Sequence, residues 1–194
     1  MRLIGVLLVL LSVACQPTAA PEVYGRVPEF TLTDQTGAPF SSQALNGRVA
    51  LLDFVYTHCT DVCPMLSATF AQAQRKLLDE KLLGSKVVLL SLSVDPEHDT
   101  PTVLAEYGQQ FKADPASWKL LTGDWEQVYD VVTGLKVATR PVRPAAGAPA
   151  PGGTELTHSS RIVLLDGQGQ VRGYLDGQDA TADDLLAAVK KVMR

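Results

Sequence analysis

The chain has 194 residues, of which 46% are hydrophobic, and this is enough for one globular domain of ordinary size plus a leader. Its 17 basic and 21 acidic side chains give a formal net charge of -4 at pH 7. Lysine and arginine form no dense run, so the sequence lacks the electrostatic footprint of a nucleic-acid-binding protein and we exclude that class.

The first 15 residues are typical of an export signal. An apolar run from Leu3 to Ala14 follows the single charge of Arg2; it is shorter than the roughly 20 residues that span a bilayer and fits the core of a signal peptide. Cys15 resembles the lipidated cysteine of a bacterial lipobox, although Ser12 stands where leucine is usual. The alternatives are a plain cleaved signal peptide or a buried cysteine. We expect an exported protein that a lipid on Cys15 anchors to the outer face of the bacterial cytoplasmic membrane.

The first half of the domain alternates strands and helices. Residues 16–26 are rich in Pro and Ala and predict a tether, so we expect the domain to occupy residues 27–194. Turn signals and alternating apolar residues predict a hairpin-like start in residues 30–47. The apolar runs RVALLDFVY (48–56) and KVVLLSLSV (86–94) predict two buried strands. Helical spacing of apolar residues between them, from Pro64 to Gly84, predicts a helix.

The second half continues this alternation and ends differently. We expect a helix over residues 102–111, a short strand over 118–123, and a helix that Asp124 caps. A long connection rich in Pro, Ala and Gly follows, up to residue 158. The sequence then predicts two strands around a DGQG turn in residues 160–177, and a last helix with Thr181 as its cap. The overall prediction is an α/β fold with a central mixed sheet and flanking helices.

Cys59 and Cys63 lie where a buried strand meets a helix N-terminus, in the stretch FVYTHCTDVCPM. This is the carboxyl end of the strand, where open α/β sheets place their sites, and a helix N-terminus lowers the pKa of a thiol. A structural disulfide over so short a loop would constrain little unfolded-chain entropy. A thioredoxin-type redox pair has two intervening residues, whereas this pair has three; a peroxiredoxin-type site would have Pro at the position of Tyr56. A reactive dithiol and half of a metal site both remain open.

A metal site would need a third ligand, and the chain has three histidines. His58 adjoins Cys59 at a strand end, where neighbouring side chains point to opposite faces, so we do not expect it to be a ligand. His98 lies in the polar turn DPEHDTP and is expected to be a solvated surface residue. His158 ends the long loop, before a strand expected to pair near the strand that leads to Cys59, and is the best candidate. Two thiolates and an imidazole select copper or zinc; zinc usually takes a fourth ligand.

Three segments together resemble the Sco/SenC family of membrane-anchored factors for copper delivery to cytochrome c oxidase. They are FVYTHCTDVCP with its Cys-x-x-x-Cys-Pro motif, SVDPEHDTP (Ser93 to Pro101), and THSSRIVLLDGQGQVRGYLDG. They occur in the order found in the family, and the similarity runs from about Val27 to the C-terminus. We read DPEHDTP as architecture that supports the site, with Asp99 or Thr100 capping the next helix.

The resemblance implies a thioredoxin-like fold and a copper ion, Cu(I) or Cu(II), bound by Cys59, Cys63 and His158. It implies work on the dinuclear copper centre of the copper-bearing oxidase subunit, by copper donation or by reduction of that centre's cysteines through the redox-active pair Cys59 and Cys63. An exported dithiol tends to be oxidised, so we also expect an exported thioredoxin-like reductant as a partner, with another copper chaperone as a further candidate. The sequence departs from the family at Thr157, where Asp is common.

Overall fold

A computed structural model of the chain describes residues 22–137 and 160–193. The predicted signal peptide, Cys15, most of the Pro/Ala-rich loop and His158 lie outside the described residues. The elements are β1 (Gly25–Arg26), β2 (Thr31–Asp34), β3 (Pro39–Ser41), η1 (Ser42–Leu45), β4 (Val49–Val55), α1 (Val62–Asp79), β5 (Val87–Ser93), α2 (Pro101–Gln110), β6 (Trp118–Thr122), α3 (Trp125–Gly134), β7 (Arg161–Leu165), β8 (Gln170–Asp176) and α4 (Ala182–Val192). None of the helices in these two ranges has the length and apolar character needed to cross a bilayer.

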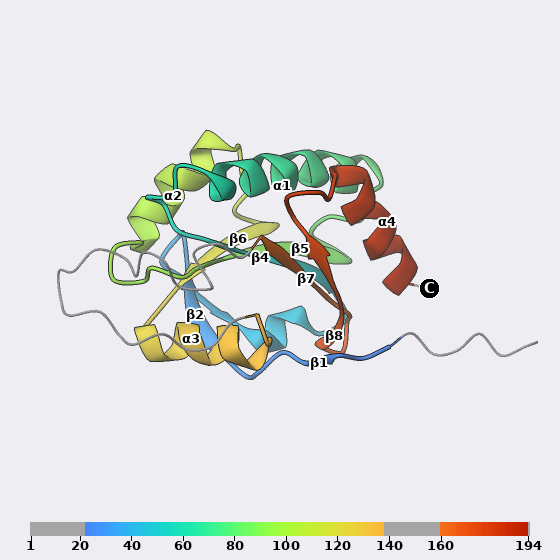
Figure 1. Cartoon of the computed structure of the whole chain (residues 1–194), viewed down its shortest axis with the longest axis horizontal. Helices are drawn as coiled ribbons and strands as arrows, with labels where there is room; N and C mark the ends of the chain where they lie inside the picture. The colour runs from blue at the N-terminus through green and yellow to red at the C-terminus, as the bar shows by residue number, and fades with distance from the viewer. Residues whose placement is uncertain (1–21, 138–159, 194) are drawn as a thin grey trace, which may run out of the picture.

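The strands form one sheet in the order β1-β8-β7-β4-β5-β6-β2-β3 (Figure 1). The strands β4, β5 and β6 are parallel, as expected for strands joined through helices. On its other side β4 pairs antiparallel with β7, which in turn pairs antiparallel with β8. This arrangement confirms the predicted mixed sheet and the predicted proximity of the strand after the long loop to the strand that leads to Cys59.

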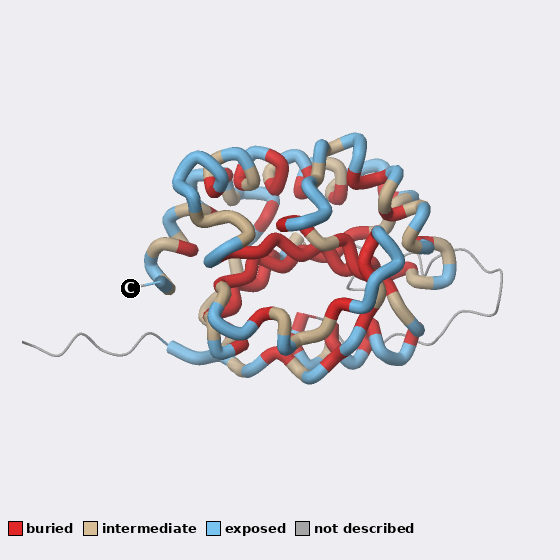
Figure 2. Tube along the Cα trace, turned by 180° about the vertical axis from the view of Figure 1, so that it is seen from behind, coloured by how far each residue is buried: buried red, intermediate tan, exposed pale blue. Residues whose placement is uncertain are grey.

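Helices cover both faces of the sheet and create two apolar layers (Figure 1). The helices α1, α2 and α4 pack on one face, whereas α3 and η1 pack on the other. Buried positions follow the sheet between these layers (Figure 2). All seven residues of both β4 and β5 are buried, because a central strand has a helix layer on each side.

The edge of the sheet begins earlier than the predicted domain boundary. Gly25 and Arg26, which lie in the range expected to be a tether, form β1 and pair with β8. The amide of Tyr24 also donates to the carbonyl of Val171, over 2.9 Å. Composition alone could not reveal this pairing, because an edge strand of two residues has no periodicity of its own.

The helix caps follow the sequence with one exception. Thr181 and Asp184 form a reciprocal capping box at the start of α4. Thr100 caps α2, with Pro101 as the first helical residue. Asp124 occupies the N-cap position of α3, but its side chain accepts no capping hydrogen bond. The N-cap residue of α1, Asp61, makes no side-chain cap either, so the first amides of α1 are available to other acceptors.

Replacing Gly177 with alanine is expected to destabilise the fold by about 1–3 kcal/mol, the usual cost of overpacking. A Cβ at Gly177 would overlap Cδ2 of Leu66 in α1 and would lie 2.6 Å from the carbonyl oxygen of Ser160. Urea denaturation of the purified chain measures the loss. Gly173→Ala in β8 is the matched control, because a Cβ there meets nothing within 4 Å. Equal denaturation midpoints for the two variants would contradict the close approach of the chain at Gly177.

Candidate metal and redox site

The two cysteines lie together between the end of β4 and the start of α1. Cys59 is in the connecting loop and Cys63 is the second residue of α1. Both are free thiols, with exposed fractions of only 7% and 2%. The backbone N–H of Cys63 donates to Sγ of Cys59 over 3.3 Å, so the helix N-terminus holds the first sulfur directly. The predicted location at a strand end and a helix N-terminus is confirmed.

The two thiols differ in acidity. Burial alone would raise the pKa of Cys59, but hydrogen bonds from the Cys63 thiol and from the amides of Asp61 and Cys63 outweigh it, and the pKa is lowered. Burial raises the pKa of Cys63 strongly, and the neighbouring Cys59 adds to the rise. Cys59 is therefore the thiol that ionises first, while Cys63 retains its proton.

The segment DPEHDTP fixes the loop that carries the cysteines. The carboxylate of Asp99 accepts hydrogen bonds from Oγ1 of Thr57 and from Oγ of Ser93, each over 2.6 Å. The amide of Val94 donates to the carbonyl of Val55 over 2.9 Å, which joins the ends of β5 and β4. Because Thr57 is two residues before Cys59, these contacts set the start of the loop. The segment therefore acts as architecture for the loop of Cys59, in agreement with the structural part of its predicted role.

The strand β4 carries a buried carboxyl group that the sequence did not predict as part of the site. Asp53 has no exposed surface, and its two carboxyl oxygens have no hydrogen-bond partner. Its neighbour across the parallel pair is Ser91, whose Oγ accepts the indole N–H of Trp118 over 3.0 Å. Burial raises the pKa of Asp53 to about 7. The signal was the single acid in the apolar run VALLDFV.

Asp53 acts electrostatically on the dithiol. Its negative charge adds to the rise in the pKa of Cys63. It also contributes to the raised pKa of Tyr107, for which burial is the main cause and whose hydroxyl lies 2.8 Å from that of Ser67 in α1. A titratable carboxyl thus lies in the helix-covered core, close enough to influence the cysteine that retains its proton.

The structure changes the interpretation of two histidines. His58 lies in a turn after β4 rather than on the strand, and its ring nitrogen is within 4.8 Å of carboxylate oxygens of Asp95 and Asp99. The strand alternation that argued against its being a ligand does not apply there. His98 is not simply solvated: its Nδ1 lies 2.9 Å from Oδ1 of Asp95, and 34% of its side chain is exposed. His158 is outside the described residues, so its place as a ligand stays a prediction.

Comparison with known proteins gives consistent results. The SCO1/SenC family profile matches residues 19–194. The chain is similar to the crystal structure of a SCO1/SenC family lipoprotein from Bacillus anthracis, with 28% identity, a TM-score of 0.75, and coverage of 91% of this chain and 99% of the other.

Two further structures are similar over most of their length. One is BsSco, described as a member of the Sco family of cytochrome c oxidase assembly proteins with a disulfide switch; it shows 28% identity, a TM-score of 0.72 and coverage of 91% and 98%. The other is copper-bound ScoI of Bradyrhizobium japonicum, with 28% identity, a TM-score of 0.67 and coverage of 87% and 99%. These matches confirm the thioredoxin-like α/β fold.

Proposed function

Since this chain belongs to the SCO1/SenC family, we propose that it is a copper metallochaperone that serves assembly of the dinuclear copper centre of cytochrome c oxidase. The observation that carries the proposal is the pair of free thiols in mutual contact at the N-terminus of α1. Cys59, Cys63 and His158 are the proposed ligands. The copper-bound relative and the relative described as an oxidase assembly protein support the cargo and the target.

The two thiols suit capture of Cu(I). Thiolate sulfur is a soft donor and favours Cu(I), whereas the imidazole of His158 would extend the site to Cu(II). Cys59 supplies the first thiolate because its pKa is lowered. Cys63 has to lose its proton as copper binds, so binding releases a proton and weakens at low pH. The buried surroundings of both sulfurs limit access of water and oxidants to the bound ion.

The same asymmetry supports a second candidate function, reduction of a disulfide in the copper-bearing oxidase subunit. The Cys59 thiolate would attack one sulfur of that disulfide, forming a mixed disulfide and releasing one thiolate of the partner. Cys63 would then lose its proton and attack the Cys59 sulfur, which forms the Cys59–Cys63 disulfide and releases the second thiolate. Two electrons pass to the partner. A lowered pKa at the attacking thiol and a protonated second thiol fit this sequence of steps.

Both functions require a reduced dithiol outside the cytosol. The family relative described as a lipoprotein supports an exported chain held at the membrane through Cys15. An oxidising compartment would convert the pair to a disulfide, which offers no thiolate ligand. The proposal therefore includes an exported thioredoxin-like reductant as a partner, and another copper chaperone as a source of the metal.

The two functions can be distinguished in cells whose cytochrome c oxidase depends on this protein. If copper delivery is the essential task, His158→Ala and Cys59→Ser should both lose the dinuclear copper centre, measured by oxidase activity and by the near-infrared absorbance of that centre. Added copper should partly restore the His158 variant, because its two thiolates are intact, and should not restore the Cys59 variant.

The opposite result would favour reduction. A His158→Ala strain that assembles oxidase normally, beside a Cys59→Ser strain that fails, would assign the protein to thiol reduction, since disulfide exchange does not use an imidazole at that position. Thr60→Ser, in the same loop as the cysteines, is the matched control and should assemble the oxidase at the level of the unaltered chain.

A further inference from the structure

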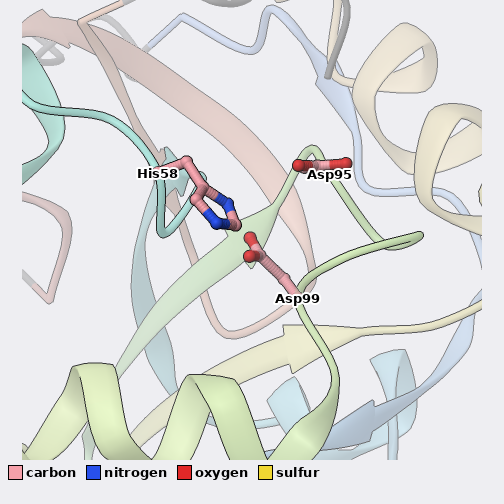
Figure 3. A group of neighbouring side chains, drawn as sticks. All are labelled: His58, Asp95 and Asp99. Carbon is pink, nitrogen blue, oxygen red and sulfur yellow. The ribbon is translucent and has the colours of Figure 1, made fainter. Parts of the chain in front are cut away.

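A group of metal-ligating side chains lies beside the dithiol and does not include a cysteine. His58, Asp95 and Asp99 each offer one ligand atom, and these atoms all lie within 4.8 Å of one another. Figure 3 shows the His58 imidazole pointing toward the Asp99 carboxylate, with Asp95 on the same loop as Asp99. The three residues come from the loops that follow β4 and β5, so the carboxyl ends of two central parallel strands bring them together.

The carboxylates of Asp95 and Asp99 are buried, and the described groups that contact them carry no permanent positive charge. Asp95 is 4% exposed and Asp99 is fully buried. Asp99 accepts hydrogen bonds from Ser93 and Thr57, which are neutral groups, and Asp95 is paired with the ring of His98. In residues 22–137 and 160–193, no lysine or arginine forms an ion pair with either carboxylate. Two buried acids this close repel each other, and a cation between them would offset the cost of desolvation.

The chemistry of these donors differs from that of the dithiol. One imidazole nitrogen and two carboxylate oxygens are borderline-to-hard ligands, which suit divalent transition metals such as Zn²⁺ and Cu²⁺ and are poor ligands for Cu(I). Nδ1 of His98 lies 2.9 Å from Oδ1 of Asp95, so this histidine orients the carboxylate from outside the group. The rings of His98 and His58 are 6.0 Å apart between centroids, which places a second imidazole at the edge of the same site.

We propose that His58, Asp95 and Asp99 bind a divalent transition-metal cation of the Zn²⁺ or Cu²⁺ class at a second site, distinct from the dithiol. His58 is exposed, so the ion can enter from solvent, and the two buried carboxylates hold it against the ends of β4 and β5. The chain then separates metals by ligand softness, with Cu(I) on sulfur and a divalent ion on nitrogen and oxygen, both in the loops that follow β4 and β5 and the start of α1.

The test removes the dithiol site first. In the full chain carrying Cys59→Ser, Cys63→Ser and His158→Ala, titration with Zn²⁺ against a chromophoric chelator should still show binding of one ion. With Cu²⁺ in place of Zn²⁺, the electron paramagnetic resonance spectrum should show nitrogen hyperfine coupling and no sulfur character. Adding His58→Ala should weaken the binding of Zn²⁺ by about tenfold or more and remove the nitrogen coupling, because one of three ligands is lost.

Asp99→Asn should weaken the binding of Zn²⁺ to a similar degree. If this variant of a buried residue fails to fold, His58→Ala still tests the proposal. Asp61→Asn is the matched control: it removes an exposed carboxylate from the same loop and should leave Zn²⁺ affinity within about twofold, as expected for a screened surface charge. Absence of Zn²⁺ binding in the triple variant would overturn the proposal. The proposal would also be overturned if His58→Ala left both the Zn²⁺ affinity and the Cu²⁺ spectrum unchanged. Neither result would bear on copper delivery through Cys59 and Cys63.

Discussion

Cys59→Ser is expected to lower Cu(I) affinity by more than about a hundredfold. Changing a residue that only supports a metal ligand costs about 10–100-fold, and this variant removes a ligand itself. Cys59 is the more acidic of the two thiols, and its sulfur also accepts a hydrogen bond from the backbone N–H of Cys63 at the start of α1. Competition with a Cu(I)-specific chromophoric chelator, under anaerobic conditions with the thiols reduced, measures the affinity.

Cys63→Ser should lose Cu(I) affinity to a similar degree and also reduce stability, because it leaves a hydroxyl at a position with 2% exposure. Thr60→Ala, between the two cysteines, is the matched control and should retain the affinity of the unaltered chain. Retention of tight Cu(I) binding by Cys59→Ser would show that the dithiol is not the copper site, and the metallochaperone proposal would then fail.

Asp53→Asn is expected to raise the free energy of unfolding above pH 7 by up to about 4 kcal/mol, at about 1.4 kcal/mol per pKa unit. Burial raises the pKa of Asp53 in the folded chain to about 7, whereas the unfolded chain has an ordinary value of about 3.9. Below pH 4 the carboxyl is protonated in both states, so the penalty for burying its negative charge is absent. As pH rises from 4 to 7 the folded state retains the proton that the unfolded state loses, so stability falls, and the full penalty is present above pH 7.

Urea denaturation at pH 4.5 and at pH 8 tests this expectation, and the gain from Asp53→Asn should appear mainly at pH 8. Asp34→Asn provides a buried control of opposite sign. Burial alone would raise the pKa of Asp34, but hydrogen bonds from Lys119 and Thr36 outweigh it and the pKa is lowered. Its stabilising contribution is present above the unfolded pKa and is lost as pH falls, so Asp34→Asn should destabilise most near neutral pH. A gain from Asp53→Asn of equal size at both pH values would mean that the effect is packing rather than charge.

The sequence by itself determined the main elements and the place of the dithiol. Long apolar runs such as residues 48–56 and 86–94 predict buried strands because only a central strand can bury side chains on both faces. Apolar residues at helical spacing predict the helix after Cys59, and local chemistry predicts the cap at Thr181. For α2 the sequence leaves Asp99 and Thr100 as alternatives, and the structure shows that Thr100 is the cap. These features depend on contacts between residues that are close in sequence, or on burial, which the apolar character of the residues already indicates.

Only the tertiary structure decided which polar side chains meet. Whether β1 exists depends on its pairing with β8, which is about 145 residues away in the chain. The grouping of His58 with Asp95 and Asp99 depends on the parallel pairing of β4 and β5, which carries their loops to one edge of the sheet. The raised pKa of Asp53 likewise arises from helices packed over β4. Each depends on distances between segments remote in sequence, which no local pattern specifies, because electrostatic and hydrogen-bond energies follow separation in space rather than along the chain.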